Sequence, residues 1–169
     1  HIPFCNLSCH YCDFHFSTNL TKKDEMVLAL AKEIEMRKNE FQDSIVETIY
    51  FGGGTPSILQ IEDLKFLIDA VYKNYKVVEN PEITVEANPD DLTENRRIEI
   101  SNNKVNRLSI GIQSFFEDDL QLMNRAHNVE EAKKCLEIAT HYFDNISIDL
   151  IYGVPEMSNE KWLQNIETA

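Results

Sequence analysis

The sequence predicts an α/β protein built on a mostly parallel sheet. Segments rich in β-branched and aromatic residues alternate four to five times with segments of helical periodicity, and no linker or low-complexity stretch interrupts them. Strands joined through helices run parallel, with right-handed crossovers. Several predicted strands mix apolar with polar residues, as strands do when one face looks into a barrel or a cleft. Ligands in such folds bind at the carboxyl ends of the strands.

The helices follow from apolar residues that recur every three or four positions. The first helix is expected to begin with Thr21 as its N-cap and to carry Met26, Leu30 and Ile34 on one face. A break near residues 127–128 allows one helix or two in the long segment after the third strand. The expected helical ranges are 21–41, 60–76, 92–103, 117–143 and 159 onward.

The strands are β-rich runs that stop at glycine or at Asn-Pro. The expected strands are 46–51, 82–86, 107–112 and 145–152. All five glycines of the chain fall within or just after these strands, and Gly52, Gly53 and Gly54 are consecutive. Glycine lets a ligand approach the backbone closely, so the three consecutive glycines predict a ligand-binding turn. For Gly153 a plain turn is an equally good explanation.

Composition limits the classes of function. The net charge of −13, from 16 Lys and Arg against 29 Asp and Glu, disfavours binding to nucleic acid or to anionic membranes. No apolar run approaches the roughly 20 residues of a transmembrane segment, and the first residues lack the features of a signal peptide. We therefore expect a cytoplasmic protein. The chain opens without Met on residues 1–4 and closes within a helix, so residues 1–169 are expected to be a fragment of one domain.

Three of the four cysteines form Cys-x3-Cys-x2-Cys, at Cys5, Cys9 and Cys12. An odd number of thiols in a cytosolic chain argues against a disulfide framework and favours a metal site. Structural zinc takes four ligands, usually in two pairs, and no second pair exists, although a zinc-stabilised binding module stays open. Cys135 is expected to be a buried apolar residue. A four-iron cluster held by three cysteines leaves one iron open, and S-adenosylmethionine (SAM) can chelate that iron.

This motif, with the aromatic Tyr11 before the last cysteine, is the signature of the radical SAM superfamily. The chain resembles one branch of it, the oxygen-independent coproporphyrinogen III oxidases and their relatives, the HemW haem chaperones. The segments that carry the resemblance lie in family order, and they are His-Ile-Pro-Phe-Cys at 1–5, Gly-Gly-Gly-Thr-Pro-Ser at 52–57, Glu-Ala-Asn-Pro at 86–89, Asn-Arg-Leu-Ser-Ile-Gly-Ile-Gln-Ser-Phe at 106–115 and Ile-Asp-Leu-Ile-Tyr-Gly-Val-Pro at 148–155.

The resemblance implies a partial (β/α)6 radical SAM barrel, similar to a TIM barrel, that is truncated at both ends. Residues 1–169 would be part of one core domain, with the cysteine loop at 5–12 and with later strands and a C-terminal domain absent. The three motif cysteines would ligate a 4Fe-4S cluster. The residues that the resemblance assigns to cofactor binding are Tyr11, Gly53, Gly54, Thr55 and Glu86 for the first SAM and its surroundings, and Gln113, Arg125 and Asp149 for a second SAM.

Each polar assignment has a structural alternative. Glu86 or Asp149, at strand ends, could cap a neighbouring helix, and Arg125 could sit in a surface ion pair. His10, His15 and His127 could in principle ligate haem iron, but an isolated histidine is more often structural. The sequence identifies no catalytic residue.

One departure separates the two branches. The oxidase carries a further cysteine two positions after the last cluster ligand, and this chain has Phe14 there. The form Cys-Asp-Phe resembles the HemW branch, so a haem chaperone that binds haem and delivers it to target proteins is favoured. The alternative is a true oxidase, which converts coproporphyrinogen III to protoporphyrinogen IX. The implied partners are haem or a porphyrinogen, a haem-accepting protein and an electron donor.

Overall fold

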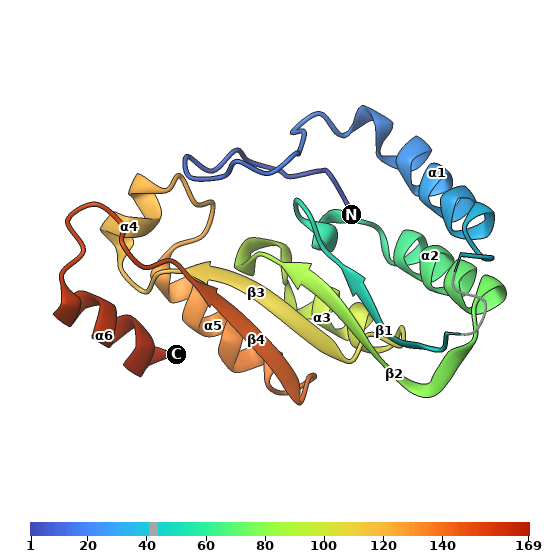
Figure 1. The fold of residues 1–169 in the computed structure, drawn as a ribbon. Coiled ribbons are helices and arrows are strands. Elements are labelled where there is room, and N and C mark those ends of the chain that lie inside the picture. Colours follow the sequence, from blue (N-terminus) through green and yellow to red (C-terminus); the bar gives the residue numbers. More distant parts are fainter. Residues whose placement is uncertain (41–43) are drawn as a thin grey trace.

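Four parallel strands form the centre of the fold (Figure 1). The computed structural model describes residues 1–40 and 44–169. Within them the strands are ordered β1-β2-β3-β4, as the alternating sequence pattern predicts. Their bounds are Val46–Phe51 for β1, Val77–Ala87 for β2, Arg107–Gln113 for β3 and Asn145–Leu150 for β4.

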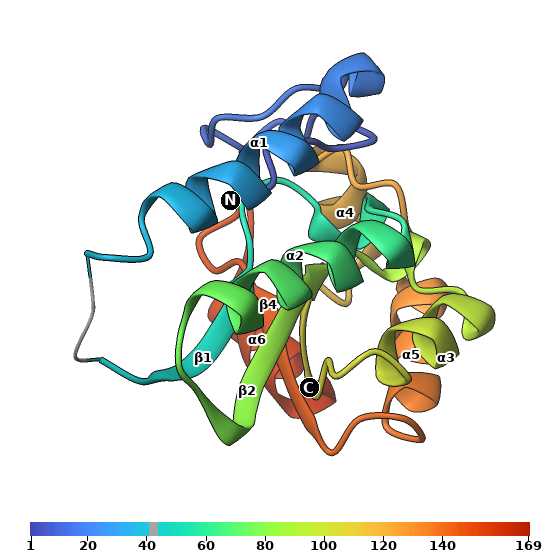
Figure 2. The same cartoon turned by 90° about the vertical axis from the view of Figure 1, so that its right-hand side faces the viewer.

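Helices connect the strands and cover one face of the sheet (Figures 1 and 2). In both views α2, α3 and α5 lie along that face, and α1 packs beside α2. The helices are α1 at Lys23–Met36, α2 at Ile61–Asn74, α3 at Glu94–Ser101, α4 at Glu117–Leu122, α5 at Val129–Ala139 and α6 at Asn159–Thr168, with short 3-10 turns at Leu20–Lys22, Pro56–Ile58 and Pro89–Asp91.

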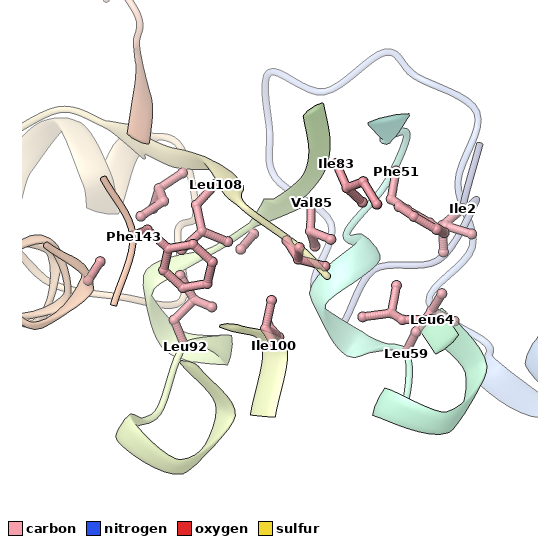
Figure 3. Close-up of a cluster of buried hydrophobic side chains, with 14 of the residues drawn as sticks. Ile2, Phe51, Leu59, Leu64, Ile83, Val85, Leu92, Ile100, Leu108 and Phe143 are labelled. Carbon is pink, nitrogen blue, oxygen red and sulfur yellow. The ribbon is translucent and has the colours of Figure 1, made fainter. Parts of the chain in front are cut away.

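The strands divide their side chains between an apolar and a polar face. Successive residues of a strand point to opposite faces. In β3, Leu108, Ile110 and Ile112 are fully buried on the helix side, whereas Ser109 and Gln113 face the other way and line a pocket. Figure 3 shows the core, in which residues of β2 and β3 pack against Leu59, Leu64, Leu92 and Ile100. This division explains why the strands mix residue types.

Side chains at the helix ends correct the expected boundaries. Thr21 is not the N-cap of the first helix, because it lies in the turn Leu20–Lys22, where the side chain of Asn19 accepts a hydrogen bond from the Thr21 N–H. The helix then ends at Met36 instead of reaching residue 41, and residue 41 lies outside the described residues. The expected break in 117–143 is confirmed, since Asn128 begins α5 with a capping box.

Strand β2 begins at Val77, five residues before the expected start at 82. The early part crosses Asn80 and Pro81, where proline cannot donate to a neighbouring strand. Asn106, just before β3, replaces the missing pairing: its Oδ1 accepts from the Ile83 N–H at 2.8 Å, and its Nδ2 donates to the Pro81 carbonyl at 2.8 Å. A side chain thus continues the ladder where β3 has not yet begun.

The first residues of the chain lie beside the turn after β1. Ile2 bridges Gly53 in parallel, with the Ile2 N–H donating to Gly52 O at 2.7 Å and the Gly54 N–H donating to Ile2 O at 2.8 Å. Ile2 and Phe4 are buried in the core, which fixes the direction of the chain. The cysteine loop at 5–12 is thereby placed over the carboxyl ends of the strands.

Candidate cofactor site

A pocket of ≈ 420 Å³ lies at the carboxyl ends of the strands, under the cysteine loop. It receives side chains from the loop, from the turn after β1 and from the ends of β2, β3 and β4. The structure brings every sequence-predicted site residue to this pocket, namely Cys5, Tyr11, Cys9, Cys12, Gly53, Gly54, Thr55, Glu86, Gln113, Arg125 and Asp149. Glu86, Gln113 and Asp149 meet there because the carboxyl ends of parallel strands lie at one edge of a sheet, whereas the cysteine loop and Arg125 reach that edge from other segments.

The three motif cysteines are free thiols that face the same pocket. The Cys12 N–H donates to Cys9 O at 3.2 Å, which makes a turn between these two cysteines. Burial raises the pKa of the Cys5 thiol. Within residues 1–40 and 44–169, no three His, Cys, Asp or Glu side chains stand close enough to hold a metal ion as they are.

Two glycines in the turn after β1 are required by space or by backbone conformation. Gly53 has a φ of 123°, which L side chains rarely adopt. A Cβ on Gly54 would lie 2.6 Å from Phe4 O and 2.9 Å from Cys5 Sγ. The turn can approach the cysteine loop this closely only because position 54 has no side chain.

Glu86 holds the same turn from the other side. Its Oε2 accepts a hydrogen bond from the Gly53 N–H at 3.0 Å, and its Oε1 accepts one from the Tyr50 hydroxyl at 2.8 Å. These partners replace the helix-capping role that was considered for Glu86. Asp149 lies at the end of β4, and partial burial together with the negative charge of Glu86 raises its pKa. Two carboxylates therefore face one pocket and favour a ligand with ammonium or hydroxyl donors.

Arg125, in the connection after α4, reaches across the pocket. Its Nη2 donates to Asn88 Oδ1 at 2.7 Å and to Gly111 O at 2.8 Å. Its Nη1 lies 3.4 Å from Cys9 Sγ and 3.2 Å from the Tyr11 hydroxyl. Burial raises the pKa of Tyr11 to about 12, although the charge of Arg125 opposes this shift. Arg125 is thus a pocket residue, and the surface ion pair considered for it is not formed among the described residues.

Asn88 is a site residue that sequence reasoning did not single out. It accepts from Arg125 and donates from Nδ2 to Thr55 Oγ1 at 3.3 Å, so it joins two predicted site residues. A polar residue directly after β2, in the quoted Glu-Ala-Asn-Pro segment, was the available signal. Gln113 also has an unusual backbone, with a φ of 70° at a register shift between β3 and β4. This conformation ends the regular strand at the pocket.

Of the other candidates, Cys135, His127 and His10 do not line this pocket, whereas Phe14 does. Cys135 is buried, with Arg97 Nη1 3.9 Å from its sulfur, as expected of a core cysteine. His127 is buried, and its Nε2 lies 3.2 Å from Ile112 O. His10 Nδ1 lies 3.0 Å from Leu122 O. Phe14 does line the pocket, and it is 73% exposed.

The arrangement of a cysteine loop, a glycine turn and polar strand ends over a parallel sheet defines a class of protein. The sequence profile of the radical SAM superfamily matches residues 1–169, and the chain belongs to this superfamily. The superfamily implies SAM and a 4Fe-4S cluster as cofactors. No helix in the described part of the chain has the length and apolarity to cross a membrane.

Within the superfamily, the chain is similar to two bacterial proteins that share one description. The chain is 37% identical over 172 residues to a Bacillus subtilis protein described as "Heme chaperone HemW", and 35% identical over 172 residues to the Escherichia coli protein of the same description. Both alignments cover 100% of this chain but 45% and 46% of those proteins. The chain therefore spans about half the length of the curated relatives it matches.

A solved structure matches the fold. Coproporphyrinogen III oxidase (HemN) from Escherichia coli, a radical SAM enzyme, superimposes with a TM-score of 0.87 at 29% sequence identity, over 99% of this chain and 39% of that one. The expected partial radical SAM barrel is thus confirmed. In the described residues its four strands form an open sheet in the order β1-β2-β3-β4.

Proposed function

We propose that the protein is a haem chaperone of the HemW type, which binds haem and passes it to a haem-requiring protein. The observation that carries this proposal is Phe14. It lines the pocket where the oxidase resemblance calls for a further cysteine, and an apolar side chain there suits a porphyrin face better than it suits proton or radical chemistry. The two bacterial relatives described as haem chaperones support the same choice.

The residues present fit the implied cofactors. Cys5, Cys9 and Cys12 would hold the 4Fe-4S cluster, because three thiols face one pocket and Cys135, the fourth, lies elsewhere. A cluster with three protein ligands leaves one iron open for SAM, and the bound pair supplies one-electron chemistry when reduced. The absence of a side chain at Gly54 lets Cys5 lie against the turn after β1.

The polar groups would orient SAM. We assign Glu86 and Asp149 to ammonium or hydroxyl groups of the cofactor, because both are carboxylates on the pocket face of the sheet. Gly53 and Thr55 would accept close contact from the cofactor at the turn. Arg125 would balance the negative charge of the thiolates, since its Nη1 already lies 3.4 Å from Cys9 Sγ.

The second candidate is a coproporphyrinogen III oxidase. Gln113, Arg125 and Asp149, which the resemblance links to the oxidase's second SAM, all line the same pocket, and this observation favours the enzyme. In that reading the substrate is the porphyrinogen and the protein needs an electron donor. For either function we place residues 1–169 within one core domain of a longer cytoplasmic protein, whose remaining length would complete the barrel.

One experiment separates these functions. The whole protein is reconstituted anaerobically with iron and sulfide, and then incubated with SAM, a reductant and coproporphyrinogen III, in parallel with a haem titration. We expect stable haem binding without decarboxylation. Formation of protoporphyrinogen IX would instead establish the oxidase, and a purified protein that carries zinc without iron–sulfur absorbance would establish the zinc-stabilised module.

A further inference from the structure

The cysteine loop is poorly held by apolar packing. Leu7 and Tyr11 are 40% and 42% exposed, and Ser8 and His10 are exposed as well. Behind His10 and Tyr11 lies a second, mostly apolar cavity of ≈ 390 Å³, which is also lined by Leu122, Met123 and Ile151. A segment with few buried contacts opens locally at low free energy unless polar contacts restrain it.

Those polar contacts come from the end of α4 and the residues after it. The His10 N–H donates to Met123 O at 3.0 Å, and His10 Nδ1 lies 3.0 Å from Leu122 O. A carbonyl can only accept, so Nδ1 of His10 carries the proton. Asn124 Nδ2 donates to Ser8 O at 2.8 Å.

Together with Arg125, this segment contacts each of the consecutive loop residues 8–11. Arg125 Nη1 approaches Cys9 Sγ and the Tyr11 hydroxyl, as described above. The segment that makes these contacts is distant in sequence: Leu122 lies 112 residues after His10, and Asn124 lies 116 residues after Ser8. Residues 122–125, the clamp, therefore restrain the cysteine loop.

Asn124 has the backbone conformation that such a role requires. Its φ is 56°, in the left-handed region, and asparagine is among the few non-glycine residues that tolerate it. This conformation turns the chain sharply after α4. It allows the Asn124 side chain and the Arg125 side chain to reach neighbouring loop residues.

We infer that Asn124 is a positioning residue that fixes the cysteine loop before metal arrives. By holding Ser8 O, it restricts the loop between the first two cysteines, so that fewer loop conformations are lost when the cysteines bind a metal centre. The loop order that the clamp imposes is a property of the metal-free protein. The consequence for metal binding rests on the proposed cluster, whereas the loop order itself does not.

Two variants test the inference, each against a matched control. Asn124→Asp keeps size and shape but replaces the amide donor with a carboxylate. Asn124→Gly removes the amide while favouring the same φ, so backbone strain cannot explain its effect. Asn103→Asp is the control, because Asn103 is similarly half-buried and donates from Nδ2 to Glu99 O at 2.7 Å, away from the loop.

The first measurement is amide hydrogen exchange in the metal-free whole protein. Loss of one hydrogen bond of about 1 kcal/mol corresponds to about fivefold faster opening, so exchange at residues 8–12 should rise about fivefold in both Asn124 variants and stay unchanged in Asn103→Asp. If exchange at these residues stays within about twofold of wild type in both variants, Asn124 does not order the cysteine loop and the inference is wrong. If one variant does not fold, the other decides.

The second measurement is the rate at which the reconstituted protein releases iron to a chelator. We expect about fivefold faster release from both Asn124 variants, without a larger loss of thermal stability than the control shows. Equal release rates would overturn the link between loop order and metal retention. If even the wild type takes up no iron, the proposed cofactor fails, whereas the exchange measurement still decides whether Asn124 orders the loop.

Discussion

Cys9 and Cys135 carry the same thiol in different surroundings. Cys9 lines the pocket next to Arg125, whereas Cys135 is buried beside Arg97. Cys9→Ser should therefore reduce the iron content of the reconstituted protein from about four per chain to background, because two thiolates cannot hold the cluster. Cys135→Ser, the control, should retain the iron. Iron analysis and the electron paramagnetic spectrum measure both, and an unchanged spectrum in Cys9→Ser would show that the ligand assignment is wrong.

Glu86 contributes a charge and two accepted hydrogen bonds, and these can be separated. In Glu86→Gln the amide oxygen can still accept from Gly53 and the amide group can donate to Tyr50, so the fold should persist. SAM binding should weaken at least about tenfold, since hydrogen bonds to charged groups contribute about 1.5 kcal/mol or more. Calorimetry of the reconstituted protein checks this. Glu82→Gln, on the same strand away from the pocket, should bind SAM as the wild type does.

The same substitution has an electrostatic signature that needs no SAM. Glu86 is one cause of the raised pKa of Asp149, after burial. Removing its charge should move the pKa of Asp149 back toward the ordinary aspartate value. Carboxyl resonances of the metal-free protein report this shift, and an unmoved Asp149 would mean that the two carboxylates do not interact.

Asp91 makes stability depend on pH. Burial, and then the charge of Asp90, raise its pKa to about 6, although hydrogen bonds from Ser57 and Asn6 oppose the shift. Because the folded protein holds this proton more tightly than the unfolded chain does, protonated Asp91 stabilises the fold. This contribution to the free energy of unfolding is fully present below the pKa of the unfolded chain, near 3.8, and is lost as the pH rises through about 6. Between pH 4 and pH 7.5, Asp91→Asn should therefore gain stability relative to wild type. Urea unfolding at both pH values checks the sign, and a relative loss would contradict it.

In the loops that follow β1 and β4, Gly54 and Gly153 are required for different reasons: Gly54 by lack of space and Gly153 by its backbone conformation. A Cβ at Gly54 has no room, whereas Gly153 has nothing within 4 Å but a φ of 73°. Gly54→Ala should displace the cysteine loop and lower iron content and SAM affinity. Gly153→Ala should leave both unchanged and lower the free energy of unfolding by about 1 kcal/mol, because only the backbone is strained. Iron content similar to wild type in Gly54→Ala would contradict the close approach.

The order of elements could be predicted from the sequence, but several of their ends could not. Residue periodicity predicts strands such as β3 and β4 because apolar residues occupy every second position along their whole length. It fails at the start of β2, because Val77 pairs with Val46 of β1 across a register shift that precedes the pairing of Thr48 with Glu82. It fails also at Thr21, because Asn19 takes the capping role two residues earlier. One failure comes from an irregular strand pairing and the other from a single side chain that bonds to a backbone group, and residue periodicity records neither.

At the scale of the molecule, α6 is tied to the end of β3 through a buried polar network. Asn165 is fully buried, and its Oδ1 accepts from the Phe115 N–H at 2.6 Å. Asn165→Ala leaves that amide without a partner and should lower the free energy of unfolding by about 2 kcal/mol. Gln164→Ala, on the exposed face of α6, is the control. Denaturant unfolding measures both, and equal stabilities would mean that α6 docks by other contacts.

The position of the site was predictable because parallel strands bring their carboxyl ends to one edge, whereas residues such as Tyr11 and Arg125 were predicted only through the family resemblance. Its internal connections were not predictable. Asn88 joins Arg125 to Thr55, and Glu86 accepts from Gly53, through contacts between segments that the chain places 30 to 40 residues apart. Such contacts depend on side-chain rotamers in the folded protein. Motif spacing therefore indicates which residues meet, whereas the structure is needed to show how they bond.

The pocket draws its wall from both ends of the chain, from Cys5 to Ile151. Contacts of such long sequence separation form late, because loop closure must precede them. Until β4 joins the sheet and the residues after α4 reach the cysteines, the pocket lacks the side chains of Arg125 and Asp149. A chain in which β4 has not docked would therefore keep its three cysteines but lack part of the surface assigned to SAM, so SAM binding would report that the sheet is complete.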